Sequence, residues 1–531
     1  MKNKFLMLAI GFQFVLFNCF SQTVGPYTIK PSSEFLSEEN LPLAQTNPLS
    51  NGDVLLTYAK GEKLDEVAFQ LFSSDLTMKS NSVPNVKGLF ANSKSYFERV
   101  LVLNKKSYVF VREVFKDTKT EGVSAVEFSA NSLEIIGQPI KLFQSTRGII
   151  YGGMGYSAFT SNDKTKVFYK YNLFNKERKD ILNKQEFGFY MFDENMKEIW
   201  GGEFTMPYSE AKMTEIDYQV SNDGKLYYLI RVTDVEGKNG TSHFEILVYD
   251  KGKQNPKIIE LKIDEYTPRS TYIYEDKSNN IVVAGFYSKV GNPSIDGAFM
   301  VKLDVANGNF SKIGGGYYEI PSDVIKSFIS DRHKEKLEKK EKKNKDNDKK
   351  ELGINDLQIK RVHFMENGST VIVSEIYYVV THVTVDSKGN TRTTYDTYAN
   401  DIFVFSIDAV GNLSWIKKIP KRQHEGGASG QGISLSSSVK NNHVHLFYLD
   451  HIENFTLPEN EEPRVHQSRR GGFVAAVDID EKGEIKKYNL GAAEQFETNL
   501  YMRKFVDGKK NNLVAVERKK KKNILFSIDI K

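Results

Sequence analysis

The amino-acid sequence predicts an all-β fold, a β-propeller of eight four-stranded blades closed by pairing of the two chain ends. Three observations predict it. A strand–turn–strand unit recurs along the chain, a second such unit follows each first one, and the last repeat lacks a strand that the N-terminus could supply. The chain of 531 residues is long enough for one large repeat fold, and its 40% hydrophobic content excludes a disordered chain.

The first unit is clearest in "YQVSNDGKLYYLIRVTD", Tyr218 to Asp234, where a polar turn separates two strand-like runs. Asn, Asp and Gly suit the turn because they tolerate positive φ, and the following run is rich in Val, Ile and Tyr, as buried strands are. Related turns lie at Asn51, Asn104, Asn162, Asn222, Asp276, Asn367, Asn441 and Asp507. Each copy predicts the first two strands, A and B, of a blade.

The second unit supplies strands C and D, as in "FEILVYDKGKQNPKIIEL", Phe244 to Leu261, and "IFVFSIDAVGNLSWIKKI", Ile402 to Ile419. The first turns are farther apart than the about 40–45 residues of a compact blade, so insertions must lengthen the repeats. Because the same motif continues on both sides of every insertion, residues 22–531 are expected to form one propeller domain. Eight blades fit the repeats best, and seven is the alternative.

The two ends of the chain complement each other. The last repeat offers strand A in "NLYMRKFV", Asn499 to Val506, then strands B and C, and the chain stops before a strand D. The strand-like piece "VGPYTIKPS", Val24 to Ser32, precedes the first blade and could take that place. Pairing of this piece with the last strand would close the ring and cover two open sheet edges.

Residues 1–21 are expected to be a cleaved signal peptide. Lys2 and Lys4 precede an apolar run, Phe5 to Phe17, which is shorter than the roughly 20 residues of a membrane span. Small residues at Cys19 and Ser21 predict cleavage after Ser21, and Asn18 argues against a lipoprotein anchored at Cys19. We therefore expect a soluble periplasmic or secreted protein whose mature chain has no cysteine, and so no disulfide.

A resemblance follows from the fourth repeat. "VSNDGKLYYLIRV…FEILVYD", Val220 to Asp250, resembles the WD40-like repeat of bacterial envelope β-propellers, with its Ser-x-Asp-Gly-Lys turn and a later strand that ends in Asp. The third repeat has "SNDKTK" without the glycine. The other repeats keep the strand–turn–strand pattern but not the residues of the motif. The resemblance implies a propeller fold and protein partners, and it implies nothing about catalysis.

Long loops are expected on one face of the ring. Strand direction alternates, so A–B and C–D turns share one face, and B–C and D–A loops share the other. The latter include a charged insertion, residues 321–354, and a long hairpin, Val380 to Asn400, that turns at Lys388 and Gly389. Because scaffolds usually carry function on their long loops, this face is the predicted binding face.

Basic clusters are predicted on the same face. They are Lys176, Arg178, Lys179, Arg469, Arg470, Lys519, Lys520, Lys521 and Lys522. Such a concentration of charge would attract an acidic protein surface or acidic polymer, and salt would weaken this attraction. The alternative is dispersed solubilising charge. The formal net charge of +5 gives no case for nucleic acid.

Arginines on or near the predicted A strands could line the central channel. They are Arg99, Arg269, Arg361 and Arg503. Arginine forks grip carboxylates and phosphates, so these side chains are candidate ligand-binding residues. The alternative is that they pair with neighbouring acids such as Glu98.

Motifs that would define catalysis are missing from the sequence. His443 and His445 point to one face of a strand and are weak metal candidates, but no spacing identifies the further ligands that zinc needs. We therefore expect no metal and no cofactor. The sequence favours a binding or scaffold protein of the cell envelope over an enzyme. The alternatives are a hydrolase or lyase acting on acidic polysaccharide, and a periplasmic partner of an outer-membrane secretion assembly.

Overall fold

The computed structural model describes residues 21–37, 41–60, 66–90, 93–115, 117–118, 120–145, 156–173, 183–233, 242–290, 294–330, 334–335, 339, 354–467, 471–496 and 498–531. These residues form an all-β structure whose strands fall into eight sheets. The predicted all-β class and the antiparallel four-stranded arrangement are both confirmed. The predicted signal peptide, apart from Ser21, lies outside the described residues.

Between residues 43 and 319, strands pair antiparallel in chain order, four to a sheet. Sheet 1 is β3 (Leu43–Pro48), β4 (Val54–Ala59), β5 (Val67–Phe72) and β6 (Met78–Ser82). Sheet 2 is β7 (Lys94–Val102), β8 (Ser107–Phe115), β9 (Thr120–Phe128) and β10 (Ile135–Ser145). Sheet 3 is β11 (Tyr156–Thr160), β12 (Lys166–Asn172), β13 (Lys184–Asp193) and β14 (Glu198–Ser209). Sheet 4 is β15 (Met213–Val220), β16 (Leu226–Thr233), β17 (Ser242–Tyr249) and β18 (Lys257–Glu260). Sheet 5 is β19 (Tyr266–Glu275), β20 (Ile281–Lys289), β21 (Gly297–Asp304) and β22 (Asn309–Glu319).

The later sheets carry additions. Sheet 6 is β23 (Leu357–Phe364), β24 (Thr370–Val385), β25 (Thr391–Ile407) and β26 (Leu413–Ile419), and β27 (Gln423–Gly426) and β30 (His466–Gln467) extend it. Sheet 7 is β28 (Leu435–Lys440), β29 (His443–Asp450), β31 (Phe473–Ile479) and β32 (Ile485–Ala492). Sheet 8 is β33 (Val506–Asp507), β34 (Asn512–Lys519) and β35 (Lys522–Ile530), joined by β2 (Tyr27–Pro31) and β1 (Gln22–Val24). The hairpin expected at Lys388 and Gly389 is present between β24 and β25.

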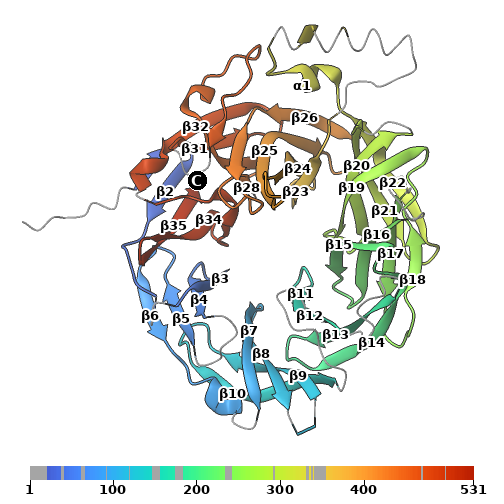
Figure 1. Ribbon diagram of the computed structural model, residues 1–531, viewed down its shortest axis with the longest axis vertical. Coiled ribbons are helices and arrows are strands. Elements are labelled where there is room, and N and C mark those ends of the chain that lie inside the picture. Colours follow the sequence, from blue (N-terminus) through green and yellow to red (C-terminus); the bar gives the residue numbers. More distant parts are fainter. Residues whose placement is uncertain are drawn as a thin grey trace, which may run out of the picture.

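The sheets follow one another around a ring (Figure 1), with the first strand of most sheets toward the centre. This is the arrangement of a β-propeller. The middle strands of the sheets are buried on both faces, because each sheet packs between two neighbours; β4 and β5 are buried throughout. That packing explains why the middle strands read as continuous apolar runs rather than alternating ones.

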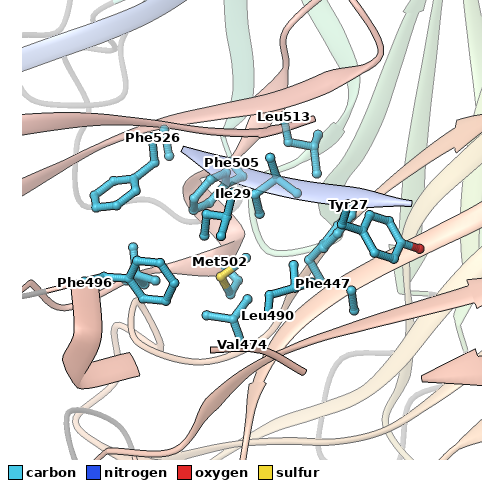
Figure 2. Close-up of a cluster of buried hydrophobic side chains, with 14 of the residues drawn as sticks. Tyr27, Ile29, Phe447, Val474, Leu490, Phe496, Met502, Phe505, Leu513 and Phe526 are labelled. Carbon is cyan, nitrogen blue, oxygen red and sulfur yellow. The ribbon is translucent and has the colours of Figure 1, made fainter. Parts of the chain in front are cut away.

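The N-terminal strand β2 lies beside the C-terminal strand β35. The two pair antiparallel from Tyr27, opposite Ile530, to Pro31, opposite Phe526. Tyr27 and Ile29 are fully buried in a cluster that also contains Phe447 of sheet 7, as Figure 2 shows. The segment expected to supply the missing strand is therefore part of the core between sheets 7 and 8.

One strand prediction is wrong. "NLYMRKFV" does not form a long A strand: Met502–Lys504 is a 3₁₀ helix, η5, and only the two residues of β33 pair with β34. Met502 and Phe505 are both buried, and their spacing of three residues suits a 3₁₀ turn, in which such side chains share one side. Arg503 therefore lies on this short helix and not on a strand.

Short α and 3₁₀ segments account for the described helices. They are α1 (Ser322–Lys326), η2 (Lys87–Phe90), η3 (Ile452–Asn454), η4 (Ala493–Phe496) and η5. Within the described part of the chain, no helix is long and apolar enough to cross a membrane.

Candidate binding face

Turns on one face of the ring are short. The A–B and C–D connections are tight, and the longest of them spans residues 250–256. In the fourth repeat, Ser221 Oγ accepts a hydrogen bond from the Lys225 amide at 3.0 Å, and Gly224 takes a φ of +87°, which favours glycine. The described turns on this face therefore differ little from one repeat to the next and carry no long insertion.

Connections on the opposite face are long in sheets 5 to 8. The longest are the D–A connections 320–356, 420–434 and 493–505 and the B–C connection 451–472. Two of them touch: the Phe328 amide donates to the Glu459 carbonyl at 2.8 Å, and Ser330 Oγ donates to Glu462 Oε1 at 3.0 Å. We call the surface formed by the described residues of these four connections the loop face.

A buried ion cluster supports the loop face between sheets 6 and 7. Glu375 at the middle of β24 and Lys421 after β26 are both fully buried, and Lys421 Nζ lies 2.7 Å from Glu375 Oε1. Glu375 Oε2 accepts a hydrogen bond from Ser434 Oγ at 2.6 Å and lies 3.2 Å from Lys360 Nζ. Lys421 Nζ also donates to the Ala399 carbonyl at 2.8 Å. One carboxylate thus ties together β24 and the start and end of the 420–434 connection.

The electrostatics of this cluster follow from burial and pairing. Burial alone would raise the pKa of Glu375, but the nearby Lys421 and Lys360 outweigh it, so the pKa of Glu375 is lowered. Burial lowers the pKa of Lys421, and Glu375 opposes that shift. Breaking such a pair leaves an uncompensated buried charge, which typically costs about 3–5 kcal/mol.

A pocket of about 510 Å³ opens on the loop face beside sheet 7. Its lining combines polar side chains with a few apolar ones: His451, His466, Gln467, Asn489, Glu494, Ile452, Val465 and Phe473. Asp450 precedes the lining residue His451 and is fully buried, and its Oδ2 lies 2.9 Å from Lys487 Nζ. Asn454 Nδ2 donates to Asp450 Oδ1 at 2.7 Å, which anchors the 451–472 connection to the sheet.

His466 is the most unusual group in the pocket wall. It is only 2% exposed, and its Nε2 has no hydrogen-bond partner among the described residues. Burial lowers the pKa of His466 to about 4, although Asp450 opposes the shift, so the imidazole is neutral at neutral pH. Gly472 is required beside it: φ is +91°, and a Cβ would come within 2.7 Å of His466 Nδ1. The pocket wall therefore contains a buried, neutral imidazole.

Charged residues in the middle or at the loop-face end of several B strands are the functional candidates that the sequence patterns did not reveal. They are Arg112 in β8, Lys170 in β12, Glu375 in β24, Asp450 in β29 and Glu517 in β34. Each has a charged neighbour across strands or connections, as with Arg112 Nε and Glu98 Oε1 at 3.1 Å and Lys170 Nζ and Glu215 Oε1 at 2.6 Å. The available signal was a charge inside an otherwise apolar strand, which is rare unless the charge is paired.

The four predicted channel arginines are spread over the ring. Arg99 lies on β7 and Nη1 donates to the Ala158 carbonyl of β11 at 3.1 Å. Arg269 Nε donates to Ser288 Oγ at 2.7 Å within sheet 5. Arg361 lies exposed on β23, and Arg503 Nη1 donates to the Gly430 carbonyl at 2.8 Å. Arg99 thus links β7 to β11, and Arg503 links η5 to the 420–434 connection.

The predicted basic clusters are only partly described. Lys176, Arg178, Lys179, Arg469 and Arg470 lie outside the described residues. In the turn between β34 and β35, Lys519 Nζ and Lys522 Nζ lie 2.6 and 2.9 Å from Glu34. Lys520 and Lys521 are exposed at the tip of that turn. The net field of this cluster is therefore weaker than its four lysines suggest.

The two candidate metal-binding histidines have other partners. His443 Nδ1 lies 2.7 Å from Asp478 Oδ1, and His445 Nδ1 lies 2.8 Å from Tyr27 Oη. In the ranges that the structure describes, no group of three or more His, Cys, Asp or Glu side chains could hold a metal ion.

Comparison with known proteins places the chain in no family. No protein-family model matches it, and no curated protein matches it. Among solved structures, the β-propeller domain of the Trilobed protease from Pyrococcus furiosus has 10% identity, a TM-score of 0.34, and coverage of 85% of this chain and 95% of its own. The WD40 domain of SCAP from fission yeast has 9% identity, a TM-score of 0.37, and coverage of 95% and 98%. Prolyl oligopeptidase B from Galerina marginata has 10% identity, a TM-score of 0.38, and coverage of 92% and 55%. The WD40-like envelope repeat stays a resemblance.

Proposed function

We propose that the protein is an exported β-propeller that binds a partner at the cell envelope through its loop face. In this proposal the eight sheets are eight blades, and β2 completes the last blade and closes the ring. One observation supports the binding role most: the longest connections follow sheets 5 to 8, and two of them, 451–472 and 493–505, contribute residues to the pocket at His466. A rigid scaffold that carries long loops on one side is the usual arrangement for recognition.

The buried ion pairs favour a preformed binding surface. The Glu375–Lys421 pair and the Asp450–Lys487 pair hold the ends of the 420–434 and 451–472 connections to their sheets. A surface held in this way loses little conformational entropy when a partner docks. The pocket lining supports a partner with both polar and apolar groups, and the exposed Lys520 and Lys521 support an acidic one.

Site-specific photo-cross-linking in the source cells tests the proposal. A benzophenone side chain would replace Ile452, which is 56% exposed at the pocket, and in a matched control it would replace Val410, which is 68% exposed on the opposite face. We expect a discrete cross-linked partner from position 452 and none from position 410. Equal products from both positions, or none from either, would contradict the proposed binding face.

A second candidate function is a hydrolase or lyase that acts on acidic polysaccharide. Asp217 on β15 favours it, because burial raises the pKa of this carboxyl to about 6, although hydrogen bonds from the Tyr218 and Ile273 amides lower it. Perturbed carboxyls of this kind are candidates for acid–base catalysis. Incubation with a panel of acidic and neutral glycans tests it. If neither the wild-type protein nor the Asp217→Asn variant forms any product at high protein concentration, this candidate is removed.

A further inference from the structure

The hairpin of β24 and β25 extends far beyond the rest of sheet 6. Strand β23 pairs with β24 only up to Ile376, whereas β24 and β25 stay paired as far as Val385 and Thr391. From Thr381 to Thr394 every residue of this hairpin is exposed. It belongs to a B–C connection, so it projects on the side of the loop face.

The two faces of the extended hairpin differ in chemistry. One face carries no charge: it consists of Val379, Thr381, Val383, Val385, Thr391, Thr393 and Tyr395, which the pairing register places on one side. Val383 and Val385 are 62% and 65% exposed. The other face is polar, with His382 Nε2 2.9 Å from Asp396 Oδ2. A sheet face of exposed β-branched residues without charge is unusual on a solvated surface.

The two edges of the hairpin also differ. The β25 edge is extended at the base of the hairpin, where Asp396 to Ala399 pair with β27, and β30 pairs with β27 in turn. The β24 edge is open: from Tyr378 to Val385, β25 is its only backbone partner among the described residues. This stretch contains no Pro and no Lys, the residues that usually protect an open edge from strand addition.

We propose that an extended segment of a partner protein adds to the β24 edge as a further strand. Its main chain would pair with Tyr378 to Val385. Its uncharged β-branched or apolar side chains at alternate positions would then pack beside Val379, Val383 and Val385 on the same face of the sheet. This mode of recognition takes affinity from main-chain hydrogen bonds and specificity from alternate side chains. The inference rests on the proposed function and names the class of partner that the loop face receives.

Two other occupants fit less well. The chain's own insertion is one, but residues 340–353, "KEKKNKDNDKKELG", have no alternating apolar pattern to match an uncharged face. A second copy of the chain is the other. The open edge is one strand wide, which suits a peptide strand, whereas a stable interface between two folded proteins usually buries about 1,200–2,000 Å².

Binding of a defined peptide tests the inference. The probe is a fluorescein-labelled peptide of alternating Val and Thr, acetyl-STVTVTVTK-amide, and its control carries Pro at alternate positions, which removes the donors needed for pairing. We expect saturable binding of the first peptide to the full mature chain and none of the second. Hydrogen exchange in residues 378–385 should slow when the first peptide is bound, because their free amides become paired.

Two variants separate this mode from non-specific adhesion. Val383→Lys with Val385→Lys places charges on the uncharged face and should weaken peptide binding about tenfold or more. Thr384→Gln lies on the same strand but on the polar face and adds no charge to the edge, so it should change binding less than twofold. Equal binding of both peptides, equal loss in both variants, or no binding at all would overturn the inference. A homodimer that Val383→Lys with Val385→Lys dissociates would overturn it in favour of a second copy. If these experiments fail while cross-linking from position 452 succeeds, the proposed function stands without this inference.

Discussion

Tyr27 Oη lies 2.8 Å from His445 Nδ1, which joins the N-terminal strand β2 to strand β29 across 418 positions of the sequence. Both side chains are buried, and the Tyr27 ring packs edge-on against Phe447 and Tyr488. Strand β2 is therefore held by sheet 7 through side chains and by sheet 8 through its backbone.

Removal of β2 should destabilise the whole ring. Deleting residues 25–33 would leave β35 with an open edge and would empty the site of Tyr27 and Ile29 in the core. We expect a lower melting temperature and aggregation through the exposed edge. The milder variant Ile29→Ala should cost about 2–5 kcal/mol of unfolding free energy, measured by chemical denaturation.

Strand β1 provides the matched control for that deletion. It pairs only with β2, at the outer edge of sheet 8. Deleting residues 22–24 should therefore leave the melting curve within a few degrees of wild type. If both deletions have the same effect, or if removal of 25–33 has none, the ring does not depend on β2.

The buried Glu375–Lys421 pair should show strong energetic coupling. Lys421→Met alone should destabilise the protein by about 3–5 kcal/mol, because Glu375 keeps a buried charge that only Lys360 compensates. The double variant Glu375→Leu with Lys421→Met should lose less than the sum of the two single losses. Chemical denaturation of all four proteins completes the cycle, and strictly additive losses would mean that the pair is not coupled.

Glu517 should make stability depend on pH. It is 1% exposed, and burial raises its pKa to about 7, although Lys504 opposes the shift. Because the folded state holds this proton more tightly than the unfolded state, the contribution is fully present below about pH 4.5 and is lost as pH rises through about 7. Glu517→Gln mimics the protonated form, so it should gain about 1–3 kcal/mol relative to wild type at pH 8 and little at pH 4.5. Denaturation at both pH values measures this, and a difference independent of pH would contradict it.

The basic turn of sheet 8 should contribute to capture on an anionic matrix. Lys520→Glu with Lys521→Glu leaves the two lysines that pair with Glu34 in place, and it should reduce retention at low salt about twofold or more. The control, Lys251→Glu with Lys253→Glu, makes the same charge change at an exposed turn of the opposite face. Retention that falls equally in both variants would show that only net charge matters.

Local patterns predicted much of the fold. The turns at Asn222 and Asp276 and the apolar runs after them depend on neighbours a few residues away, so a single sequence reveals them. The short helix at Met502–Lys504 escaped prediction because its form depends on which side chains sheet 8 buries. The added strands β27 and β30 escaped it because β27 pairs with the hairpin strand β25 and β30 pairs with β27, each tens of residues away in the chain.

The candidate site was less predictable than the fold. Arg99 and Arg503 are candidate ligand-binding residues by sequence, and only the structure shows that their guanidinium groups donate to the Ala158 and Gly430 carbonyls. His466 has no motif around it, and its significance comes from burial without a partner for Nε2. Neither the contacts of the arginines nor the burial of His466 can be predicted from the residues next to them in the sequence.

Sequence patterns alone predicted the all-β class, the recurring four-stranded unit and the side of each unit that could carry long loops. These depend on strand periodicity, turn chemistry and alternation of direction, which are local. The packing of the whole molecule is needed to show that Glu375 meets Lys421, that His466 lines a pocket, and that β27 pairs with Asp396 to Ala399 of β25 while Tyr378 to Val385 of β24 have no second strand beside them among the described residues. Such relationships depend on how sheets pack around the ring, because that packing sets the distance between residues far apart in the chain and the access of water to each of them.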